Sequence, residues 1–138
     1  MGIVYVDITL RNATDVVIAR RENGKAPEIR QTTVRAVVDT GSATLVINEA
    51  IQQQLGLGTG ATVYRAELAD GSKRTFSCTE PVQIQWKDRS MICEAVVVPS
   101  ATTVLLGAIP LEAMDLIINP AALEITGAHG DEALHKIY

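Results

Sequence analysis

The residues with the clearest chemical potential are Asp39 and the three that follow it, Thr40, Gly41 and Ser42. The apolar stretch Thr32–Val38 leads directly into Asp39, so a half-buried strand would deliver the carboxylate at its end. A carboxylate held in this way can act as a general acid or a general base. Gly41 permits backbone conformations that other residues avoid, which suits a tight turn. The alternative interpretation is a structural aspartate that only caps the turn.

The elements that must position this loop are predicted to be mostly short strands. Alternating and β-rich stretches predict strands over residues 3–10, 16–20, 32–38, 63–67, 73–77, 82–86, 91–98 and 123–125, with two more before Gly107 and up to Ile118. The composition of residues 20–28, which include Asn23, Gly24 and Pro27, predicts a turn.

Two short helices are expected among these strands. Apolar residues recur at helical spacing over residues 47–55, where Asn48 can cap the start and Gly56 can end the helix. A second helix is predicted over Pro110–Met114. The nearby glycines at positions 56, 58 and 60 would suit a nucleotide-binding loop only if they opened a helix, and here they close one.

Ala69-Asp70-Gly71-Ser72 lies between two alternating runs, and an Asp-Gly pair in that setting is a strong hairpin signal. The hairpin tip is either a plain surface turn or part of a binding site. Asp70 is interpreted as a turn-forming residue rather than as a catalytic group.

Composition excludes several classes of function. The chain has 138 residues, 47% of them hydrophobic, and a net charge of −4, which fits one folded domain and no nucleic acid partner. No apolar stretch reaches membrane-spanning length and no signal peptide is visible, so we expect a soluble, cytoplasmic protein without a membrane partner. Cys78 and Cys93 lack metal-ligand spacing, which favours free thiols over a disulfide and predicts no metal site. His129 and His135 are expected to be exposed in a polar tail.

Four segments in order carry a family resemblance. The stretch Val38–Ser42 resembles the active-site motif of aspartic proteases. The segments "NEAIQQQLGL", "LADGS" and "VLLGAIPLEAMDLIINP" follow it as in single-domain retropepsin-like (retroviral-type) proteases, and the similarity spans Thr32–Ile125. The stretch "AIPLEAM" resembles bacterial-type members more than viral ones, and the hairpin tip lacks a glycine-rich flap of the viral kind.

The resemblance implies an all-β, retropepsin-like closed β-barrel with one or two short helices, which forms a homodimer. It implies a protease domain over residues 1–126, followed by a polar C-terminal tail over residues 127–138. It also implies a supporting loop beside the catalytic loop, made of Leu105, Leu106 and Gly107. A flap over an extended peptide substrate would consist of Leu68, Ala69, Asp70, Gly71 and Ser72.

Amide hydrolysis by this route needs two carboxylates that share one proton, and no cofactor. The chain has one Asp-Thr-Gly, and none of its other aspartates follows an apolar strand into a Thr/Ser-Gly. The expected function is therefore an aspartic-type endopeptidase in which Asp39 pairs with Asp39 of a second copy. The alternative is a catalytically inactive retropepsin-like module for dimerisation or peptide binding.

Overall fold

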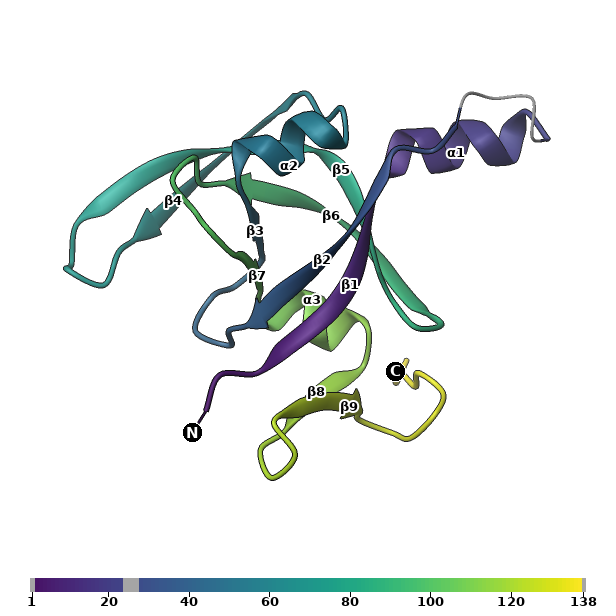
Figure 1. The fold of residues 1–138 in the computed structure, drawn as a ribbon, viewed down its shortest axis with the longest axis vertical. Helices are drawn as coiled ribbons and strands as arrows, with labels where there is room; N and C mark the ends of the chain where they lie inside the picture. Colours follow the sequence, from purple (N-terminus) through teal and green to yellow (C-terminus); the bar gives the residue numbers. More distant parts are fainter. Residues whose placement is uncertain (1, 24–27, 138) are drawn as a thin grey trace.

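Strands are the main regular structure in the part of the chain that the structure, a computed structural model, describes: residues 2–23 and 28–137 (Figure 1). The strands are β1 Tyr5–Asn12, β2 Gln31–Val38, β3 Leu45–Ile47, β4 Thr59–Glu67, β5 Lys73–Trp86, β6 Arg89–Val97, β7 Val104–Leu106, β8 Leu116–Asn119 and β9 Glu124–Gly127. The helices are α1 Ala13–Arg21, α2 Glu49–Gln54 and α3 Ala108–Ala113.

Six of the strands close into a barrel. They are hydrogen-bonded in the order β1-β2-β7-β3-β6-β5, and β1 also pairs with β5, which completes the ring. β4 extends beyond the ring as the outer partner of β5, and β8 and β9 form a separate two-stranded sheet. The predicted all-β, closed-barrel fold class is confirmed.

The barrel interior holds the main hydrophobic core. Alternation along β1 buries Val6, Ile8 and Leu10, while Tyr5 and Asp7 face outward. This period of two is what a half-buried strand requires, because successive side chains point to opposite faces of the sheet. A smaller cluster of Phe76, Cys78 and Val96 lies apart from the main core, with Tyr64, Ala66 and Leu68 of the β4–β5 hairpin packed on it.

The expectation of a strand over Val16–Arg20 is wrong, because these residues lie in α1. The β-branched Val16-Val17-Ile18 favours a strand by intrinsic propensity, but the ends of the segment favour a helix. The Asn12 side chain caps α1 by accepting a hydrogen bond from the Asp15 amide. Acidic Asp15 in the first turn and basic Arg20 and Arg21 in the last turn complement the helix dipole.

The β5 region also differs from expectation. The predicted strands 73–77 and 82–86 are parts of one 14-residue strand, which has a register irregularity between Cys78 and Pro81. Pro81 has no N–H to donate, so it is tolerated at a bulge, where the strand bends from the hairpin into the barrel.

Other predicted elements are found close to their expected places. α2 is capped by Asn48, and Gly56 follows it with a φ of 62°. Part of the turn predicted over residues 20–28 lies outside the described residues. Cys78 and Cys93 are free thiols, and burial raises the pKa of Cys93 to about 11. None of the described helices is long and apolar enough to cross a membrane.

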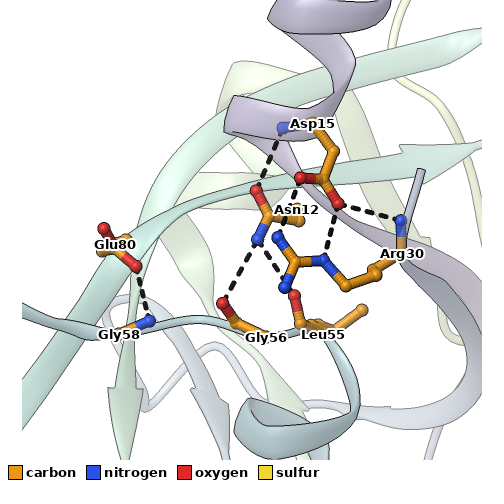
Figure 2. A network of polar contacts seen from close by, with 7 residues as sticks. All are labelled: Asn12, Asp15, Arg30, Leu55, Gly56, Gly58 and Glu80. Carbon is orange, nitrogen blue, oxygen red and sulfur yellow. Dashed lines mark hydrogen bonds and ion pairs between the residues drawn. The ribbon is translucent and has the colours of Figure 1, made fainter. Parts of the chain in front are cut away.

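A polar network joins α1 to α2 at one end of the barrel (Figure 2). The buried Asn12 accepts from the Asp15 amide at 3.1 Å and donates to the Leu55 carbonyl at 3.0 Å. Arg30 Nε and Nη2 donate hydrogen bonds to the two carboxylate oxygens of Asp15, at 2.8 and 2.9 Å. These Arg30 bonds lower the pKa of the Asp15 carboxyl group. Asn12 therefore serves both as a helix cap and as a tie to the neighbouring helix.

Replacing Asn12 by alanine is expected to lower the free energy of unfolding by about 2 kcal/mol. The Asp15 amide loses its capping acceptor, and the Leu55 carbonyl loses its donor. The matched variant is Asn48→Ala, which also removes a cap and a tie, there to the carbonyl of Ala101. Asn48 is only half-buried, so its loss should cost about 1 kcal/mol. Urea unfolding checks this, and an Asn12→Ala cost no larger than that of Asn48→Ala would contradict it.

Candidate active site

Asp39 stands at the end of β2, where the chain leaves the barrel wall and turns. Its amide donates to the Leu106 carbonyl at 3.0 Å, and its own carbonyl accepts from the Ser42 amide at 3.0 Å. The carboxylate accepts from the Gly41 amide at 3.0 Å. Asp39 is half-buried, while Thr40 and Gly41 are exposed. The loop is thus a closed turn that fixes the carboxylate and leaves it open to the surface.

β7 positions a second loop against this turn, because it lies between β2 and β3. Val38 of β2 is in parallel register with Leu106, and Leu45 of β3 is in antiparallel register with the same residue. Both leucines are fully buried. The loops that leave β2 and β7 therefore emerge side by side from the same end of the barrel.

Gly107 is packed closely against the continuation of the Asp39 loop. A Cβ at this position would lie 2.5 Å from the backbone carbonyl oxygens of both Ser42 and Thr44. Directly after Gly107, the first amides of α3 bond to the Asp39 turn and its continuation: Ala108 to the Ser42 carbonyl and Ile109 to the Ala43 carbonyl, both at 2.9 Å. Only glycine allows this close approach. The approach and the two amide hydrogen bonds hold α3 against the Asp39 loop.

An apolar surface adjoins the Asp39 loop. Thr40 borders a shallow pocket of about 260 Å³, whose other lining residues are Ala108, Leu111, Glu112, Leu116, Ile117 and Ile118 of α3 and β8. The side chains of Ile109 and Ile117 are 57% and 51% exposed. Large apolar side chains exposed beside a polar loop are typical of an interaction surface.

The β4–β5 hairpin carries the predicted flap residues at its tip. The Leu68 amide donates a hydrogen bond to the Ser72 carbonyl at 2.8 Å. The Asp70 carboxylate accepts one from the Ser72 amide, also at 2.8 Å. Gly71 has a φ of 83°, a left-handed conformation that suits glycine. The hydrogen bonds from Ser72 lower the pKa of Asp70, so this carboxylate is engaged in the turn. In Figure 1 the hairpin extends as an arm beyond the barrel.

The structure therefore brings together two of the three predicted groups. The Asp39–Ser42 turn is hydrogen-bonded to the Leu105–Gly107 loop, whereas the Leu68–Ser72 tip makes hydrogen bonds only within itself among the described contacts. Sequence reasoning missed Ala43 and Thr44, whose backbone atoms receive α3 and Gly107. Their side chains carry no signal for this role, because only their main-chain atoms take part.

A closed single-domain barrel with an Asp-Thr-Gly turn braced by an apolar-apolar-Gly loop defines the class of retropepsin-like aspartic proteases. A family model described as "gag-polyprotein putative aspartyl protease" matches residues 26–113, more than half of the chain. The chain belongs to this family. No curated protein matches the chain.

Two solved structures share the fold. The retroviral protease-like domain of Ddi1 from Leishmania major has a TM-score of 0.55 and 15% identity, with 91% of this chain and 88% of that chain covered. A retropepsin-like aspartic protease from Rickettsia conorii has a TM-score of 0.51 and 16% identity, with 86% and 78% covered. Because both identities are low, these two similarities support the assignment of the fold alone.

Proposed function

We propose that this protein is an aspartic-type endopeptidase, in which Asp39 and Asp39 of a second subunit activate the water that hydrolyses a peptide bond. The observation that carries the proposal is the Asp39 turn, which is held by the Leu106 carbonyl and by the first amides of α3. A turn braced in this way keeps a surface carboxylate at a fixed place, which acid–base catalysis requires.

The chemistry follows from two adjacent carboxyl groups that share one proton. The ionised member takes a proton from the bound water, and the resulting hydroxide attacks the peptide carbonyl carbon. The protonated member donates to the carbonyl oxygen, so the tetrahedral intermediate forms without a separated charge. The carboxyl group that took the proton from water then donates it to the amide nitrogen, and the C–N bond breaks. A hydroxyl of the intermediate returns its proton to the other carboxylate, so the products are a new carboxyl group and a new amine, and the pair again shares one proton.

One subunit supplies only one of the two carboxylates. Three of the other six aspartates are engaged elsewhere: Asp15 pairs with Arg30, Asp70 closes the hairpin tip, and Asp115 contacts His129. A two-fold axis beside the turn would bring two copies of Asp39 together, and isologous dimers are the commonest oligomers. The exposed Ile117, which lines the pocket that Thr40 borders, and the exposed Ile109 of α3 would give such a dimer an apolar contact surface.

The remaining roles complete the proposal. Thr40, Gly41 and Ser42 form the active-site loop, Leu105 to Gly107 support it, and residues 68–72 close over an extended peptide, which can pair with the hairpin by strand addition. The protease domain is proposed to span residues 1–126, and residues 127–138 follow it as a C-terminal segment whose first residue ends β9. The free thiols of Cys78 and Cys93 suit a reducing compartment such as the cytoplasm.

The rate of peptide hydrolysis is expected to show a bell-shaped pH profile with its maximum on the acid side of neutral. One limb reports loss of the ionised carboxylate, and the other reports loss of the shared proton. A mixture of fluorogenic peptides, assayed from acid to alkaline pH, measures the profile. An inactive binding module would show no turnover at any pH, and a rate that keeps rising into alkaline solution would contradict the carboxylate pair.

A further inference from the structure

A buried charge cluster lies at the C-terminal end of α3, away from the Asp39 loop, and the C-terminal segment packs against it. Arg89, at the start of β6, is 5% exposed. Its guanidinium donates to the carbonyls of Met114 and Asp115, at 3.1 and 2.6 Å, and to the Gly130 carbonyl at 2.6 Å. One side chain thus joins the C-terminal end of α3 to the C-terminal segment.

Asp115, which follows the C-cap residue Met114 of α3, supplies the opposite charge to Arg89. It is 7% exposed, and its carboxylate lies 4.0 Å from the Arg89 guanidinium. The carboxylate also accepts from the Leu134 amide at 3.0 Å and contacts His129 Nδ1 at 2.9 Å. The Leu134 bond, followed by the His129 bond, holds the pKa of Asp115 below its usual value. The Asp115 carbonyl accepts from the Ala128 amide at 2.8 Å.

The chain is folded tightly around the guanidinium. A Cβ on Gly127 would overlap the Gly130 carbonyl and would lie 2.5 Å from Arg89 Nη2. Gly130 has a φ of 89°, which glycine adopts without strain. Residues 127–134, interpreted from sequence as a plain polar tail, therefore make specific contacts with two buried charged side chains.

α3 connects this cluster to the candidate active site. It has six residues and a length of about 9 Å, and it begins with the amides that bond to Ser42 and Ala43. Pro110, Leu111 and Met114 of this region are buried, so the helix is held along its length as well as at both ends. A displacement at Met114 would be transmitted to Gly107, where no free space exists.

We propose that residues 127–134 form a docked clasp, and that Arg89 and Asp115 are positioning residues that hold α3 and, through it, the Asp39 loop. The last step, from the loop to catalysis, rests on the proposed function. The docking and the hold on α3 do not, since they are properties of the folded chain alone.

The test uses hydrogen exchange of the full chain and the variant Asp115→Asn. Asparagine tolerates the left-handed φ of 55° at this position, so the substitution removes the charge without straining the backbone. It leaves the buried Arg89 cation without a counter-charge, which loosens its site. We expect the amides of Ala128 and Leu134, and also those of Ala108 and Ile109, to exchange about tenfold faster. The control is Asp131→Asn, an exposed change in the same segment, which should leave all four rates unchanged.

A second variant keeps the test decisive if Asp115→Asn does not fold. Leu134→Pro removes one amide donor to Asp115 and leaves the Arg89–Asp115 pair in place. It should speed exchange at Ala128 and, to a smaller extent, at Ala108 and Ile109. Exchange at Ala108 and Ile109 that stays at the wild-type rate while the segment exchanges freely would overturn the proposal.

Kinetics separate this proposal from the proposed function. If peptide hydrolysis is observed, Leu134→Pro should lower kcat more than it changes KM, because a displaced Asp39 loop affects the reacting groups rather than the flap. If no hydrolysis is observed in the wild type, the exchange result still decides whether the clasp holds α3.

Discussion

Asp39→Asn is expected to lower the rate of peptide hydrolysis by about 10²- to 10⁴-fold or more, and to leave the fold and the dimer intact. The amide side chain can neither take a proton from water nor share one with its mate. Its carbonyl oxygen can still accept the 3.0 Å hydrogen bond from the Gly41 amide, so the turn should survive. The unfolding free energy should change by no more than about 1 kcal/mol.

The matched control is Asp7→Asn, which makes the same chemical change on the exposed face of β1. Initial rates with a fluorogenic peptide, taken beside sedimentation of each variant, separate loss of chemistry from loss of assembly. Wild-type activity in Asp39→Asn would remove this carboxylate from the mechanism.

Gly107→Ala is expected to lower the free energy of unfolding by roughly 3 kcal/mol. The added methyl group would lie 2.5 Å from the backbone carbonyl oxygens of Ser42 and Thr44, and 2.6 Å from the Thr44 amide nitrogen. Backbone atoms cannot move aside as a flexible side chain can, so the Asp39 loop and α3 must separate. Hydrolysis should fall with stability, because α3 braces the loop.

Gly2→Ala is the control for this substitution. A Cβ there would meet only the side chain of Leu123, at 3.1 Å, and that side chain can rotate away. Urea unfolding of the two variants should therefore differ by most of the roughly 3 kcal/mol expected for Gly107→Ala. Equal stabilities would show that the two loops are not packed as tightly as described.

The parts of the fold that sequence could predict depend on local patterns. The strand before Asp39 follows from alternation, α2 follows from the Asn48 cap and Gly56, and the hairpin follows from Asp70-Gly71. Each signal lies within a few residues of the element it specifies. The supporting loop at Leu105–Gly107 was predicted through its family resemblance, since nothing local shows that β7 lies between β2 and β3.

What sequence could not predict depends on contacts between distant residues. α1 contains β-branched residues, and its cap Asn12 is tied to Leu55, 43 positions away. The continuity of β5 depends on a bend at Pro81 that moves one strand between two sets of partners. Arg89 and Asp115 are 26 positions apart, and residues 127–134 bond to both of them. No local pattern in residues 127–134 predicts these contacts.

Mixing subunits tests most directly the claim that two copies of Asp39 make one active site. Wild-type chain and Asp39→Asn chain are combined at fixed total concentration, allowed to exchange subunits, and assayed for peptide hydrolysis. If each site needs both carboxylates, an equal mixture retains about a quarter of the wild-type activity, because only wild-type homodimers are active. Retention of about half, in proportion to the wild-type chain present, would show that each subunit works alone and would contradict the account.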